Sequence, residues 1–161
     1  MNRHKRYVIV LPEDRADEQI ANGFSNHLNV IADAIKVERP AGGWTKVLAK
    51  FSEALVPEMQ KFSKCLIVLL IDFDQNKNRL RYMQSQIPED LKERVFILGS
   101  WSNPESLKKD MKKSFEDIGE SLANDCSDNT NQLWGHDLLK HNKGEIDRMV
   151  SSVKPFLFKL Q

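Results

Sequence analysis

The sequence predicts an α/β protein in which a four-stranded, mainly parallel sheet is sandwiched by helices and followed by a C-terminal helical extension. The first observation is a run of six apolar residues at 66–71, whose β-branched members are typical of a strand buried on both faces. The second is that other apolar runs alternate along the chain with segments whose apolar residues recur at helical spacing. This order favours parallel strands joined by right-handed crossovers.

The pattern predicts strands and helices in strict alternation over the first hundred residues. The first strand is closed by Pro12, and acidic residues crowd the start of the helix that follows, where the helix dipole favours them. Polar interruptions place the second strand nearer to an edge, and Pro57 is expected to end or kink the second helix. The expected strands are residues 6–11, 29–39, 66–71 and 95–99. The first expected helix begins within the acidic segment 13–18 and ends at about His27, and the next two cover 47–62 and 76–86.

The last third of the chain predicts only helices and loops. We expect a helix from Asn103 to about Asn124, a polar loop at 125–132, and helices at 133–140 and 145–158. Residues 1–161 then form a single domain, with an α/β core at 6–100 and a helical extension at 102–161. Three successive large apolar residues at 156–158 cannot share one helix face, so we expect one of them to contact a partner or a second copy in a homodimer.

Composition limits the classes of partner. The 24 basic and 23 acidic side chains nearly cancel, so no global field attracts nucleic acid or a membrane, and any such binding needs a local patch. The basic N-terminus precedes too few apolar residues for a signal peptide or a membrane span, which predicts a cytoplasmic protein that does not enter membranes. Cys65 and Cys126 show neither zinc spacing nor a pairing pattern.

Carboxylates follow two of the predicted strands at their ends. Glu13 lies just past the first strand, and Asp72 and Asp74 lie just past the third. Side chains alternate along an extended segment, so Asp72 and Asp74 should point the same way, at the sheet edge where ligands of parallel α/β folds gather. Oxygen ligands of this kind suit a hard divalent cation such as Mg²⁺. The candidate catalytic and metal-binding residues are therefore Glu13, Asp72 and Asp74.

A Glu after the first strand and a D-x-D after the third resemble the TOPRIM fold, whose carboxylates bind magnesium. The acidic segment at 13–18 is similar to the E-G-x-x-D-E of the TOPRIM-like domains of OLD-family nucleases and of small standalone bacterial proteins, with Asp14 in place of the usual Gly. The resemblance covers about residues 6–100. It implies a Mg²⁺-dependent (or Mn²⁺-dependent) nuclease or related phosphoryl-transfer protein, linked with defence against mobile elements and acting on nucleic acid.

Other side chains leave alternatives open. Lys77, Arg79 and Arg81 offer positive charge near a phosphate or form the solvated face of a helix, and Glu105 is a further ligand or an acid at a helix start. His136 and His141 are five residues apart, which excludes an H-E-x-x-H metal site but leaves a role as general base or as surface helix ends. The alternative function is a non-catalytic interaction module that works with a partner protein such as an ATPase.

Overall fold

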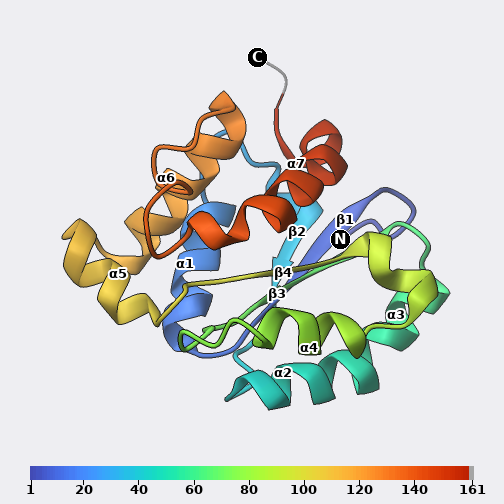
Figure 1. Cartoon of the computed structure of the whole chain (residues 1–161). Helices are drawn as coiled ribbons and strands as arrows, with labels where there is room; N and C mark the ends of the chain where they lie inside the picture. The colour runs from blue at the N-terminus through green and yellow to red at the C-terminus, as the bar shows by residue number, and fades with distance from the viewer. Residues whose placement is uncertain (160–161) are drawn as a thin grey trace.

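The computed structural model describes residues 1–159 and shows a four-stranded sheet in which all paired strands are parallel. The strand order is β2-β1-β3-β4, so the chain crosses over between β2 and β3. The sheet and its flanking helices confirm the predicted fold class (Figure 1). The strands are β1 (Tyr7–Pro12), β2 (Ile35–Val37), β3 (Cys65–Leu70) and β4 (Val95–Leu98).

Helices cover both faces of the sheet and form two hydrophobic cores (Figure 1). Alternate residues of β1 serve opposite faces: Val8 and Val10 join one core, whereas Tyr7 and Ile9 join the other. The first core is covered by α1 (Arg15–Ser25), α6 (Phe115–Asp128) and α7 (Lys143–Leu157), with α5 (Pro104–Met111) at its margin. The second is covered by α2 (Trp44–Lys50), the π-helical turn η2 (Phe51–Leu55), α3 (Val56–Lys61), α4 (Arg79–Ser85) and the 3₁₀ helix η3 (Glu89–Arg94).

Two predicted elements of the α/β part differ in detail. The second strand is confined to Ile35–Val37, because the ladder with β1 covers these three residues and residues 32–34 form a 3₁₀ turn, η1 (Ala32–Ala34). The predicted helix over 47–62 exists as α2, η2 and α3 in direct succession. Pro57 lies in the first turn of α3 and has no N–H for the helical ladder, and the π-helical turn precedes it.

The C-terminal third contains two errors of prediction. The single helix expected at 103–124 is broken at Lys112, which adopts a left-handed conformation (φ +54°) between α5 and α6. The helix expected at 133–140 does not form; turns lead to the short 3₁₀ helix η4 (Lys140–Asn142). The carboxylate of Asp125 accepts hydrogen bonds from the backbone N–H groups of Leu133 and Trp134 (2.7 and 3.0 Å), which fixes this segment as a loop.

The last helix docks onto the sheet, and its end is buried within the chain. Leu157 and Phe158 belong to the first core, and the ring of half-buried Phe156 lies under the Arg6 guanidinium, 5.0 Å from the ring centroid. The three apolar residues for which we expected a partner contact are therefore largely covered by their own chain. Within residues 1–159, no helix combines the length and apolar character needed to span a bilayer.

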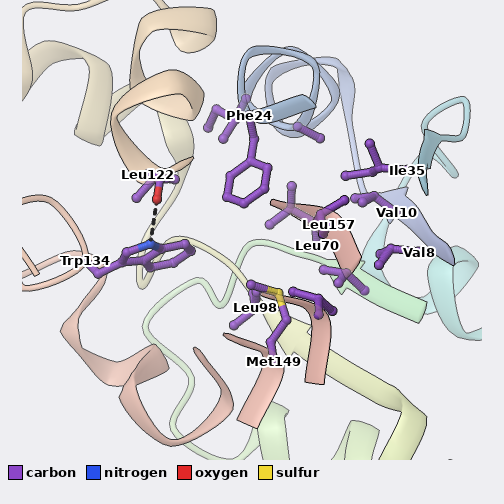
Figure 2. A pocket seen from close by; sticks show the side chains of 14 residues that line it. Val8, Val10, Phe24, Ile35, Leu70, Leu98, Leu122, Trp134, Met149 and Leu157 are labelled. Carbon is purple, nitrogen blue, oxygen red and sulfur yellow. Dashed lines mark hydrogen bonds between the residues drawn. The ribbon is translucent and has the colours of Figure 1, made fainter. Parts of the chain in front are cut away.

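A small apolar cavity of about 60 Å³ lies between the sheet and α1, α6 and α7 (Figure 2). Only hydrophobic residues line it, among them Val68 of β3, Phe24 of α1 and Val153 of α7. Trp134 closes one side, and its indole N–H donates to the carbonyl of Leu122 (3.2 Å). A cavity without polar groups stays dry, so this space is a packing defect of the first core.

Candidate functional site: a carboxylate cluster at the sheet edge

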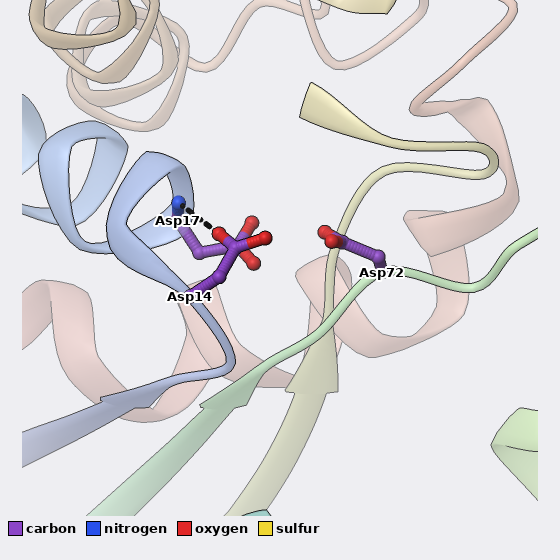
Figure 3. Close-up of side chains that lie close together, drawn as sticks. All are labelled: Asp14, Asp17 and Asp72. Atoms are coloured by element: carbon purple, nitrogen blue, oxygen red, sulfur yellow. Dashed lines mark hydrogen bonds between the residues drawn. The ribbon is translucent and has the colours of Figure 1, made fainter. Parts of the chain in front are cut away.

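Three carboxylates meet beyond the carboxyl ends of β1 and β3. Asp14 and Asp17 come from the start of α1, and Asp72 follows β3; one oxygen from each lies within 4.8 Å of the others (Figure 3). Asp14 is the N-cap of α1 and accepts a hydrogen bond from the backbone N–H of Asp17 (3.0 Å). The helix therefore holds two acids at one end, and the strand β3 delivers the third to the same place.

Two of these carboxylates are buried without full hydrogen bonding. Asp17 is 1% and Asp72 is 6% exposed, and Oδ2 of Asp17 and Oδ1 of Asp72 have no hydrogen-bond partner among residues 1–159. Burial raises the pKa of Asp72 to about 8, and burial raises the pKa of Asp17 well above its usual value, with neighbouring carboxylates acting in the same direction. Burial thus favours the protonated form of these carboxyl groups. A divalent cation would supply the missing positive charge instead.

Glu13, a predicted ligand, lies beside the cluster and connects the two strand ends from which the cluster is built. Its Oε1 accepts a hydrogen bond from the backbone N–H of Asp72 (2.9 Å), and its own N–H donates to the carbonyl of Leu70 (2.8 Å). Glu13 thereby ties the end of β1 to the end of β3. Burial is the largest cause that raises the pKa of its carboxyl group.

Asp74, the remaining predicted ligand, is held by an arginine. The side chain of Asp74 is 57% exposed, and its Oδ2 accepts a hydrogen bond from Arg79 Nη1 (2.7 Å), which also donates to the carbonyl of Asp72 (2.8 Å). The guanidinium lies 4.5 Å from the centroid of the Trp44 ring. Asp74 and Gln75 have positive φ (49° and 59°), so the chain leaves the extended geometry on which the expected alignment of Asp72 with Asp74 depended.

Two serine hydroxyls after β4 lie along the neighbouring strand end. The backbone N–H of Phe73 donates to the carbonyl of Ser100 (3.0 Å), and that of Asp74 donates to the carbonyl of Ser102 (3.2 Å). Both Ser side chains are buried, and within the described part of the chain their hydroxyls have no hydrogen-bond partner. Polar groups that lack partners thus accumulate at this edge of the sheet.

The other candidates from the sequence lie outside the cluster. Glu105 is exposed in the first turn of α5. His136 Nε2 is 2.9 Å from the carboxylate of Asp110, and its Nδ1 accepts from the N–H of Leu138. His141 packs against Phe73, with ring centroids 5.0 Å apart, and burial lowers its pKa. Neither His contributes to the three-carboxylate group.

Asp14 and Asp17 are the members of the cluster that sequence reasoning did not propose as ligands. Their D-x-x-D spacing across the start of a helix is the signal, because an N-cap and the residue three positions later lie on the same end of the helix. No protein-family model matches the chain, and no curated protein or solved structure matches it at a significant level. What the site can do follows from its own chemistry.

Proposed function

We propose that this chain is a TOPRIM-like, Mg²⁺- or Mn²⁺-dependent phosphodiesterase that acts on nucleic acid, with a role in defence against mobile elements. The observation that carries the proposal is the meeting of Asp14, Asp17 and Asp72 at the carboxyl edge of the sheet, with two buried carboxylate oxygens lacking partners. Unpaired buried carboxylates are costly unless a cation or a proton compensates them. Oxygen-only ligands favour Mg²⁺ or Mn²⁺.

The three aspartates and Glu13 have different proposed roles. Asp14, Asp17 and Asp72 would hold the cation, and Glu13 orients Asp72 through its backbone N–H. A bound divalent cation would polarise a phosphate and lower the pKa of a water molecule. Glu13, whose pKa burial raises above its ordinary value, is the candidate proton acceptor beside the cluster. Asp74 remains a candidate ligand only if its carboxylate leaves Arg79.

Metal binding and cleavage test the proposal separately. Calorimetric titration of the full chain with Mg²⁺ and Mn²⁺ should show binding that Asp72→Asn and Asp17→Asn abolish and that Asp147→Asn, an exposed acid paired with Lys143 on α7, leaves unchanged. Metal-dependent cleavage of labelled DNA or RNA should follow the same pattern. A chain that binds neither metal, or whose cleavage survives both site substitutions, would contradict the proposed role of the cluster.

A non-catalytic interaction module is the second candidate, and two observations favour it. Asp74 is already neutralised by Arg79, and the raised pKa values of Asp17 and Asp72 allow the cluster to persist with protons in place of a metal. Such a chain would act through a partner protein such as an ATPase, or as a homodimer. Co-purification of a nucleotide-hydrolysing partner with both wild type and Asp72→Asn, together with absent cleavage, would favour this candidate.

A further inference from the structure

We propose that the exposed surface formed by α5 and the start of α6 binds the phosphate backbone of a nucleic acid and leads it to the carboxylate cluster. This inference rests on the proposed function for its substrate class. The surface surrounds a shallow depression that four lysines, Phe115, Ser114 and Glu105 line. We call the lysines the α5–α6 lysine patch: Lys108, Lys109, Lys112 and Lys113.

The lining of the depression carries more positive than negative charge, although Glu116 and Asp117 lie exposed beside it in the first turn of α6. Four lysines and one glutamate line the depression, and within residues 1–159 none of the four lysines forms an ion pair. Lys108 lies over the Phe115 ring (4.8 Å to the centroid), and Lys113 donates to Ser121 (3.1 Å). The acid within the lysine segment, Asp110, is bound to His136 instead. Because the whole chain has a net charge of only +1, this local excess is the kind of patch that nucleic-acid binding requires.

The backbone gathers these charges onto one surface. Lys112 adopts the left-handed conformation that ends α5, and its N–H donates to the carbonyl of Lys108 (2.9 Å). The chain therefore turns back at Lys112 and begins α6 at its N-cap Ser114, so that the lysines of α5 adjoin the N-terminus of a 14-residue helix. Glu116 and Asp117 in the first turn of α6 offset the partial positive charge of that helix end, so the attraction for phosphate comes from the lysines.

Backbone hydrogen bonds connect the segment that leads into the patch with the segment that carries the acidic site. The segment just before α5 is hydrogen-bonded to the segment that carries Asp72, through Phe73 to Ser100 and Asp74 to Ser102. Figure 1 shows α5 beside the sheet edge at which α1 begins. An eight-residue helix is about 12 Å long. A nucleic-acid strand of a few nucleotides would therefore reach from the patch to the cluster.

The composition of the surface favours nucleic acid over a protein partner. Protein interfaces need apolar residues at their centre. The large hydrophobic side chains that are exposed in the described residues are Met1, Leu28 and Tyr82, and none of them lines the depression. Lysine ammonium groups act as point charges for phosphates.

Binding without cleavage tests this inference on the full chain. Fluorescence anisotropy would use labelled single-stranded DNA, single-stranded RNA and duplex DNA, each of about 20 nucleotides per strand, in EDTA and across a salt series. We expect a variant with all four patch lysines changed to Gln to bind at least about tenfold more weakly at roughly 0.1 M salt. The slope of log K against log salt should become shallower by roughly 0.7 to 0.9 for each phosphate that the variant no longer neutralises.

A charge-matched control separates the patch from net charge. A control variant with Gln at four other exposed lysines removes the same charge and should leave the salt slope near that of wild type. These lysines are Lys5, Lys61, Lys64 and Lys143. Equal weakening in the two variants, or wild-type binding by the patch variant, would overturn the inference, as would stronger binding of a poly-glutamate peptide than of any nucleic acid. Cleavage is measured in a separate assay. If binding depends on the patch but no cleavage occurs in Mg²⁺ or Mn²⁺, the nuclease proposal alone is rejected. If cleavage occurs but binding does not depend on the patch, the proposed role of the patch alone is rejected.

Discussion

Asp17 and Asp72 place carboxylate oxygens in the protein interior without hydrogen-bond partners among the described residues, and this defines how the site responds to pH. Their pKa values are raised in the folded chain, that of Asp72 to about 8, whereas an aspartate in the unfolded chain titrates near 4. Between these values the folded state binds more protons than the unfolded state. The free energy of unfolding therefore falls as pH rises through this window and levels off above it.

The first prediction follows from this linkage. In EDTA, the melting temperature of the wild type should decrease between about pH 4.5 and 8, and Asp72→Asn should flatten this decrease, because an amide removes the buried charge. At about pH 8, Mg²⁺ or Mn²⁺ should raise the melting temperature of the wild type, since a ligand bound only by the folded state stabilises it. Circular dichroism melts measure both effects.

Asp147→Asn is the matched control for these melts, because Asp147 is exposed and paired with Lys143. Its pH profile should parallel that of the wild type. An Asp72→Asn profile that also parallels the wild type would show that Asp72 does not titrate as the structure indicates.

Single residues also show where sequence reasoning works at this site and where it does not. Asp72 could be predicted, because a buried parallel strand must deliver the residue after it to the ligand-binding edge of the sheet. Asp14 and Asp17 were not proposed as ligands, since acids at a helix start have an ordinary explanation in capping and in the helix dipole. The position of Asp74 depends on a left-handed turn and on Arg79, which residue spacing does not encode.

Among the elements, α1 and α6 approach each other through two glycines. A Cβ atom at Gly23 would lie 1.9 Å from the carbonyl oxygen of Glu116, and one at Gly119 would lie 1.9 Å from that of Ile20. Both obstacles are backbone atoms, which cannot move without separating the helices. This contact matters for the site because α1 carries Asp14 and Asp17 at its start.

The second prediction concerns this contact. Gly23→Ala and Gly119→Ala should each lower the free energy of unfolding by about 1–3 kcal/mol through overpacking, and should weaken metal binding by displacing α1. Gly144→Ala in α7 is the control: nothing lies within 4 Å of the added Cβ, so the helix-propensity gain of roughly 0.5–1 kcal/mol should stabilise the chain. Urea denaturation measures all three. Unchanged stability in the α1 and α6 variants would mean that the two helices are not in close contact.

The elements differ in how well their sequences specify them. The apolar strands β1, β3 and β4 lie within one or two residues of their predicted bounds, because burial on both faces demands continuous hydrophobicity. The segment at 133–140 has residues that suit a helix, but Asp125 at the end of α6 takes the N–H groups of Leu133 and Trp134. Tertiary hydrogen bonds of this kind are not visible in local periodicity.

At the scale of the whole molecule, the C-terminal third is hydrogen-bonded to β4 and to the residue that follows it. The buried carboxylate of Glu145 accepts from the backbone N–H of Ile97 on β4 (3.0 Å), and the amide side chain of Asn142 bonds both the N–H and the carbonyl of Gly99 (3.1 and 2.9 Å). The helical extension was predicted to pack on the α/β body, and α7 shares the first core with the sheet. These polar links fix the end of β4 beside the carboxylate cluster.

The third prediction tests the packing defect in that core. Val68→Ile adds one methylene toward the cavity of about 60 Å³ and should raise the free energy of unfolding by roughly 0.5–1 kcal/mol. Val47→Ile places the same methylene in the second core, at a fully buried position that does not line this cavity, and should destabilise by about 1–3 kcal/mol. Urea denaturation of both variants gives the comparison. Equal destabilisation by the two would show that the cavity cannot accept the added group.

The fourth prediction concerns the chain end. Leu157 and Phe158 are 2% and 4% exposed, Phe158 forms a bridge with Val30, and the N–H of Lys159 donates to the carbonyl of Asn29 (2.8 Å). Leu157→Ala should therefore cost about 2–5 kcal/mol, and truncation after Lys154, which removes both buried side chains, should consume most of the roughly 5–15 kcal/mol that stabilises a domain. Phe156→Ala is the control, since half-buried Phe156 contacts Arg6 and should cost less than Leu157→Ala. Thermal melts combined with light scattering distinguish the alternatives. A larger destabilisation by Phe156→Ala than by Leu157→Ala, together with a fall in mass from dimer to monomer, would reveal a homodimer contact at Phe156. A constant mass and the expected order of destabilisation would show that the segment packs within its own chain.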